Sequence, residues 1–182
     1  MASDFLLLAG IDILGNTFGW FKDTPDVQIA YIGDNPLPED TAASIEDTFA
    51  SLADDYNHDG KVLVKINQFV SSEAAAPAEN GFFAAAESPA YQQAAEIALI
   101  GDIEDCVSYF FLMEDPGYVQ REYQVLAMPD GSCPDEYDFS IEDKVISWDF
   151  GLYLGRRCFY NKKQTPYAEE CSRIWNILNK TP

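Results

Sequence analysis

Residues 26–70 read DVQIAYIGDNPLPEDTAASIEDTFASLADDYNHDGKVLVKINQFV, the pattern of a strand, a helix and a second strand. The apolar run 27–32 is nearly continuous, as in a strand that is buried on both faces of a parallel sheet. The proline and the two acidic residues at 38–40 suit the first turn of a helix, and apolar residues then recur every three to four positions. A second apolar run, 62–70, follows. Two strands joined through a helix pair in parallel with a right-handed crossover, which predicts one βαβ unit.

The same alternation of strands and helices continues through the rest of the chain. The sequence predicts helices over 91–103, 116–123 and 166–180, and strands over 106–113, 144–148 and 152–160. Such alternation is typical of an open α/β sheet. We therefore expect a three-layer αβα domain over 26–182, with a mostly parallel or mixed central sheet built on strands 27–32, 62–69 and 107–113. Residues 1–25 precede it as an apolar segment, either a packing helix or the remnant of an anchor.

The charge of the chain restricts its partners. The 182 residues include 31 acidic and 11 basic side chains, which gives a formal net charge of −20. Such a surface repels phosphate backbones, so nucleic acid is not an expected partner. The apolar N-terminal segment is interrupted by Asp12 and is too short to span a bilayer, and no basic region follows Met1 as in a secretory signal peptide. We therefore expect no membrane span within this chain.

The acidic turn before the second strand contains part of a calcium-binding motif. Asp55, Asn57 and Asp59, followed by Gly60, match the first half of an EF-hand loop, whose oxygens point inward. The twelfth position of that loop is Ile66 instead of the bidentate glutamate, and a strand rather than a helix follows. In the other interpretation, the same side chains accept hydrogen bonds from backbone amides of a tight turn. We favour the turn, so no cofactor is expected, and calcium at these three residues is the alternative.

No catalytic motif is evident in the sequence. The single histidine, His58, lies in a turn between acidic residues, and the chain has no G-x-S-x-G nucleophile turn, no H-E-x-x-H and no glycine-rich nucleotide loop. Neighbouring carboxylates are frequent in so acidic a chain, so pairs of them do not identify a glycosidase. We expect a non-enzymatic protein, and a carboxylate-based hydrolase ranks last among the alternatives.

A ligand site is expected at the carboxyl ends of the strands, because ligands of open α/β sheets bind there. Asp34 and Asn35 follow the first strand, and Glu114 and Asp115 follow the third. The loop after Phe69 follows the second strand. These positions form the predicted rim of any pocket.

Two arginines near the end of the chain are further candidates for ligand binding. Arg156 and Arg157 belong to a predicted strand and are two of the few cations of the chain. A guanidinium can hold a carboxylate or a phosphate through two hydrogen bonds, but in so acidic a chain we favour an internal ion pair. The aromatic residues near them in sequence, such as Trp148 and Trp175, similarly favour a ring-rich core over a groove.

The four cysteines are scattered without a C-x-x-C pair, which argues against a zinc site. Cys158 and Cys171 lie on a predicted strand and on the helix after it, so a disulfide between them is geometrically allowed. Buried free thiols are the alternative that we favour.

Four stretches within residues 26–180 resemble a known group of proteins: DVQIAYIG, DDYNHDGKVLVKINQF, CVSYFFLMEDPGYVQREYQVLA and LYLGRRCFY. They resemble an uncharacterised family of envelope-facing domains of Gram-positive gut bacteria, which is similar in pattern to one lobe of extracellular solute-binding proteins. The resemblance implies an extracytoplasmic α/β domain of the cell envelope with no known reaction. We expect a non-enzymatic binding or interaction domain, whose partner is a small molecule or a protein. The alternative function is a structural module that forms oligomers through its apolar N-terminal segment.

Overall fold

The computed structural model describes residues 24–70, 89–159 and 163–180, which form a five-strand mixed sheet and four helices. In chain order the elements are β1 (Val27–Gly33), α2 (Glu39–Leu52), β2 (Val64–Val70), α3 (Pro89–Asp105), β3 (Phe110–Met113), α4 (Pro116–Tyr123), β4 (Val145–Ser147), the short 3-10 turn η2 (Asp149–Gly151), β5 (Tyr153–Arg156) and α5 (Ala168–Leu178). No helix in this part of the chain has both the length and the apolar character needed to cross a membrane. Residues 1–23 lie outside the described part, so assembly through the N-terminal segment stays a prediction.

The sheet has the strand order β2-β1-β3-β5-β4, and its strands run in both directions. β1 pairs in parallel with β2 and with β3, whereas β5 is antiparallel to both β3 and β4. The predicted α/β fold, the parallel pairing of the first βαβ unit and the mixed sheet are therefore confirmed. β3 is the middle strand, and it begins at Phe110 rather than at the predicted residue 107. Before it, the amide of Tyr109 already donates a hydrogen bond to the carbonyl oxygen of Gln28 at 3.0 Å.

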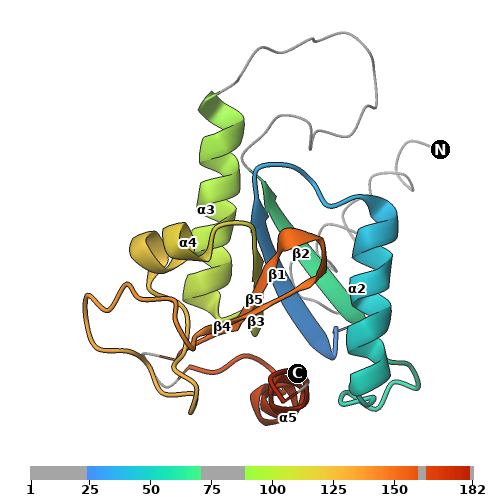
Figure 1. Ribbon diagram of the computed structural model, residues 1–182. Helices are drawn as coiled ribbons and strands as arrows, with labels where there is room; N and C mark the ends of the chain where they lie inside the picture. Colours follow the sequence, from blue (N-terminus) through green and yellow to red (C-terminus); the bar gives the residue numbers. More distant parts are fainter. Residues whose placement is uncertain (1–23, 71–88, 160–162, 181–182) are drawn as a thin grey trace, which may run out of the picture.

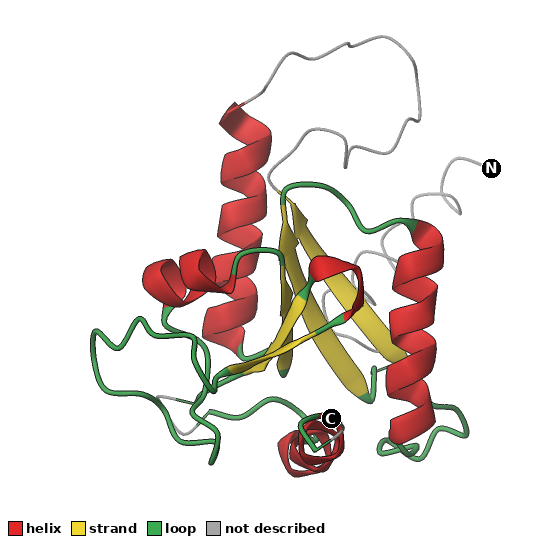
Figure 2. Cartoon of the chain, viewed as in Figure 1, coloured by secondary structure: helices red, strands yellow, loops and turns green. Residues whose placement is uncertain are grey.

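Helices cover both faces of the sheet, so the domain has three layers (Figures 1 and 2). Side chains of a strand point alternately to its two faces. On one face, Ile29 and Tyr31 of β1 belong to an apolar cluster to which α2 and α5 contribute. On the other face, Ala30 and Ile32 belong to a second cluster, to which α3 and α4 contribute. The near-continuous apolarity of β1 is thus explained by burial on both sides.

The core is rich in aromatic rings, as predicted. Phe49 of α2 lies edge-on to Phe110, with ring centroids 4.9 Å apart, and stacks on Trp148 at 5.7 Å. Trp175 of α5 is buried in the same cluster. In α5, Cys171 and the residues three and four positions further along form the buried stripe that the helical spacing predicts.

The D-x-N-x-D-G segment is a tight turn held by its own side chains. Asp55 accepts hydrogen bonds from the amides of Asp59 and Gly60 at 3.1 and 2.9 Å, and Asn57 accepts from the amide of Asp59 at 2.9 Å. Gly60 takes a φ of 94°, a conformation that favours glycine. These are the hydrogen bonds from side chains to backbone amides that the sequence predicts for a tight turn. The described ranges contain no group of three or more His, Cys, Asp or Glu side chains arranged to hold a metal ion.

All four cysteines are free thiols, so the disulfide considered between Cys158 and Cys171 is absent from the structure. Both are buried, whereas Cys106 and Cys133 are partly exposed. Burial raises the pKa of the Cys171 thiol to about 12. That thiol therefore stays protonated at neutral pH and packs as a small apolar side chain.

Candidate functional site

The carboxyl ends of β1, β2 and β3 meet at one edge of the sheet, the upper edge in Figure 1. From this edge the chain leaves β1 toward α2 on one face and leaves β3 toward α4 on the opposite face. Neighbouring strands whose connections part in this way open a crevice, which is where ligands of open α/β sheets bind. The structure has a cavity of about 490 Å³ at this position.

The walls of the cavity combine apolar, phenolic and acidic side chains. They are formed by Ile32, Gly33, Asp34, Phe69, Val70, Ala95, Glu96, Leu99, Glu114, Asp115, Tyr118 and Tyr123. The apolar members come from the strand ends and from α3, whereas the acidic members are exposed residues of the loops and of α3. No lysine, arginine or histidine is among the described residues that line it.

Glu114 joins the two loops that form the mouth of the cavity. Its Oε1 lies 2.7 Å from the hydroxyl of Tyr31, and its Oε2 accepts a hydrogen bond from the amide of Asp34 at 2.9 Å. The same hydroxyl lies 2.8 Å from the carbonyl oxygen of Asn35. A side chain at Gly33 would place its Cβ 2.8 Å from the carboxyl carbon of Glu114, closer than packed atoms allow. The glycine is thus required for this close approach.

The buried phenol of Tyr31 predicts a loss of stability at alkaline pH. Burial, with the hydrogen bond to Glu114, raises the pKa of Tyr31 in the folded protein. In the unfolded chain a tyrosine ionises at about pH 10, so the unfolded state loses its proton first and the free energy of unfolding falls above that pH. In Tyr31→Phe we expect a shallower fall between about pH 10 and 11, with a loss of about 1 kcal/mol at neutral pH from the missing hydrogen bond of the hydroxyl. Urea unfolding across this range checks the prediction, and equal slopes for the two proteins would contradict it.

Helix α4 presents two tyrosines to the cavity. Asp115 is its N-cap residue, and its carboxylate accepts a hydrogen bond from the amide of Tyr118 at 2.9 Å. The rings of Tyr118 and Tyr123 lie edge to face, 6.2 Å between centroids and 83° apart. Burial raises the pKa of Tyr123, as do its hydrogen bond with Tyr118 and the nearby charge of Glu96. Tyr123 is therefore a neutral phenol over the whole physiological range.

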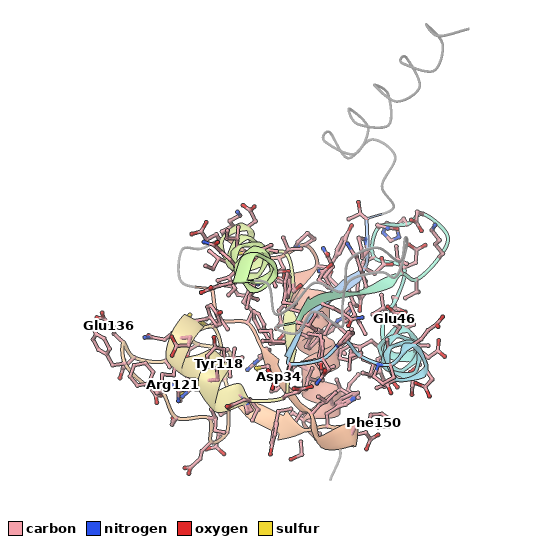
Figure 3. All side chains as sticks on the ribbon, turned by 90° about the horizontal axis from the view of Figure 1, so that it is seen from above. Asp34, Glu46, Tyr118, Arg121, Glu136 and Phe150 are labelled. Carbon is pink, nitrogen blue, oxygen red and sulfur yellow. The ribbon has the colours of Figure 1, made fainter. Side chains whose placement is uncertain are left out.

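A second cavity of about 380 Å³ adjoins the first. It shares Glu96, Tyr118 and Tyr123 with the first cavity, and its other lining residues are Ile100, Ile103, Glu104 and Glu122. All of these residues belong to α3 or α4. We call the two cavities together the α3–α4 groove. Figure 3 views this region from above and shows Tyr118 beside the sheet edge that carries Asp34.

The structure brings together most of the predicted rim. Asp34, Glu114 and Asp115 all line the cavity, together with Phe69 and the residue after it, whereas residues 71–88 lie outside the described part. Asn35 belongs to the same loop as Asp34, but it contributes its carbonyl oxygen to the hydrogen bond described above and is not among the lining residues.

Sequence reasoning missed Glu96, Tyr118 and Tyr123. The two tyrosines are five positions apart, a spacing that does not mark one face of a helix. Only the position of α3 beside α4 makes these three residues neighbours. The available signal was the cap at Asp115, because it determines where α4 begins and therefore where its first tyrosine lies.

Arg156 and Arg157 lie at the opposite edge of the sheet from the cavity. β5 is antiparallel to β3, so Arg156 is paired with Phe110, at the amino end of β3. The guanidinium of Arg157 is 2.8 Å from Asp102 and also donates to the carbonyl oxygen of Ser108, which is the internal ion pair that the acidic composition favours. Arg156 donates to the carbonyl oxygens of residues 128 and 129. Neither arginine is among the residues that line the cavity.

The arrangement is suited to holding a molecule. Glu114 joins two loops, and Asp115 caps helix α4. No serine, cysteine, histidine or lysine occurs among the described lining residues. Apolar walls with a few polar groups are typical of small-molecule sites. No protein-family model, no curated protein and no solved structure matches this chain. The function of this protein is therefore inferred from the cavity.

Proposed function

We propose that this protein is a non-enzymatic binding domain that holds a small molecule in the cavity at the carboxyl ends of β1, β2 and β3. The observation that carries the proposal is the position of the cavity, between strands whose connections leave toward opposite faces. Its volume of about 490 Å³ falls within the range of ligand sites in proteins. The mixed lining supports the same conclusion, as does the likeness in pattern to one lobe of extracellular solute-binding proteins.

We further propose that the domain acts outside the cytoplasm, at the cell envelope. The support is the resemblance of residues 26–180 to envelope-facing domains. Fractionation of the source cells, followed by detection of the protein with an antibody, tests this part separately. Recovery of the protein in the cytoplasmic fraction alone would refute the envelope location without affecting the ligand site.

Fragment screening by NMR tests the binding proposal. In protein with labelled methyl groups, fragments that bind the cavity are expected to shift the resonances of Ile32 and Leu99, which line it. Ala95→Phe places a ring in the cavity and should abolish these shifts. The matched control is Ala98→Phe, because Ala98 belongs to the same helix, is exposed and is not among the lining residues.

Two outcomes would refute the proposal. One is a diverse fragment library that shifts neither methyl resonance. The other is binding that survives Ala95→Phe and Ala98→Phe equally, because the fragments would then occupy another place. Unchanged circular dichroism of both variants shows that a lost signal reports on the cavity instead of on unfolding.

A further inference from the structure

The α3–α4 groove has charges of one sign. Six carboxylates line its two cavities, those of Asp34, Glu96, Glu104, Glu114, Asp115 and Glu122. No lysine, arginine or histidine is among the described lining residues, and Arg121, which does not line the groove, forms an exposed salt bridge with Glu122 at 3.4 Å. Concave sites with low-dielectric walls concentrate the field of such charges, and the chain as a whole carries a net charge of −20. An anionic ligand would therefore be repelled at the entrance, whereas a cation would be attracted.

Glu96 is the carboxylate best placed to meet a ligand. It belongs to α3, is exposed and lines both cavities of the groove. No described lysine or arginine forms a salt bridge with it, whereas Glu114 and Asp115 already accept hydrogen bonds from neighbouring loops and from α4. Its charge acts on Tyr123 across the groove. A positively charged ligand between these two residues would compensate that charge.

The other walls of the groove are aromatic and apolar, and a site for a bare metal ion would require neither feature. Tyr118 and Tyr123 present aromatic rings, and the faces of such rings attract ammonium groups. Ile32, Phe69 and Leu99 form an apolar wall beside them. A cavity of about 490 Å³ is large enough for an organic molecule that buries carbon against this wall.

From this combination we infer that the ligand is an organic cation, with an ammonium group held between Glu96 and the tyrosine pair and an apolar body against the inner wall of the cavity. The inference rests on the proposed binding function and specifies the chemical class of its ligand. It is carried by the shape of the cavity together with its aromatic and apolar walls, and the carboxylates determine the sign of the charge.

Three probes that share one apolar body test the sign of the charge. We would titrate the full chain with 4-phenylbutylamine, with the neutral 4-phenylbutan-1-ol and with the anion 4-phenylbutanoate, and follow the Ile32 and Leu99 methyl resonances. The amine is expected to bind about fivefold more tightly than the alcohol, and the anion more weakly than both. Raising sodium chloride to about 0.5 M should reduce the preference for the amine, because salt screens exposed charges.

Two variants test whether the preference for the amine arises from Glu96 in the groove. Glu96→Gln is expected to weaken binding of the amine about threefold or more and to leave binding of the alcohol unchanged. The control is Glu46→Gln on α2, the helix that packs on the other face of the sheet (Figure 3). It removes one equal charge far from the groove and should alter neither affinity.

Each remaining outcome is decisive. If the alcohol or the anion binds as tightly as the amine, the cation inference is wrong, while the binding function stands. If Glu96→Gln and Glu46→Gln have equal effects, the preference reflects net charge alone and the inference is also wrong. If none of the three probes binds, the cation inference fails, and the fragment screen described above decides whether the binding function fails with it.

Discussion

Replacing Asp102 with alanine is expected to lower the free energy of unfolding by about 3–5 kcal/mol, because it leaves a buried guanidinium without its counter-charge. Asp102 and Arg157 are almost fully buried, and their closest N and O atoms are 2.8 Å apart. The carboxylate also accepts hydrogen bonds from the amide and the hydroxyl of Ser108 at 3.1 and 2.7 Å. In Asp102→Ala these donors lose their partner as well. Urea unfolding followed by circular dichroism measures the change.

Two further variants compare the stability contributed by the buried ion pair with that of an exposed ion pair. Asp105→Ala removes the exposed partner of Lys163, 3.0 Å away, and should cost less than about 1 kcal/mol. Asp102→Ala combined with Arg157→Met removes both buried charges, so the double variant should be more stable than the sum of the single losses predicts. A cost for Asp102→Ala as small as that for Asp105→Ala would show that the buried pair is not needed for stability.

Replacing Asp26 with alanine is expected to cost about 3 kcal/mol, because its carboxylate holds the D-x-N-x-D-G turn from outside. Its Oδ1 accepts hydrogen bonds from the amides of Tyr56 and Asn57 at 2.7 and 3.1 Å, and its Oδ2 accepts from the amide of Leu63 at 2.8 Å. Asp26 is only 1% exposed, so water does not readily replace the lost acceptor. Besides the loss of stability, faster hydrogen exchange at these three amides is expected by NMR.

The matched control for Asp26→Ala lies inside the turn. Asp55→Ala also removes a carboxylate that accepts from two backbone amides, those of Asp59 and Gly60, but these amides belong to exposed residues. Water can satisfy them after the substitution, so we expect a cost of about 1 kcal/mol. If Asp55→Ala costs as much as Asp26→Ala, burial of the acceptor is not what makes Asp26 important.

The sequence was sufficient for those parts of the fold that depend on local patterns. The apolar run of β1 and the three-to-four spacing in α2 both reflect burial of the residue itself, so they are visible without knowledge of the partner. The role of Asp26 was not visible in this way. Its partners Tyr56, Asn57 and Leu63 lie at least 30 positions away, and only the parallel pairing of β1 with β2 brings them close.

The candidate site also has a part that the sequence predicted and a part that it did not. Asp34, Glu114 and Asp115 were predicted together because each follows a parallel strand, and the ends of parallel strands share an edge. The two arginines were candidates because they are two of the few cations of the chain and belong to a predicted strand. Their sequence does not report the direction of that strand, and because β5 runs antiparallel to β3, Arg156 and Arg157 lie at the far edge. Glu96 was missed because its role depends on which helix lies beside α4.

The hydrogen bonds that Glu114 makes with Tyr31 and with the amide of Asp34 also affect the kinetics of binding. They join the loop after β1 to the end of β3 before any ligand arrives. A ligand therefore meets a mouth that is already shaped, and it does not have to order these loops as it enters. Ligands of one chemical class should then associate at similar rates, and their affinities should differ mainly in how slowly they leave.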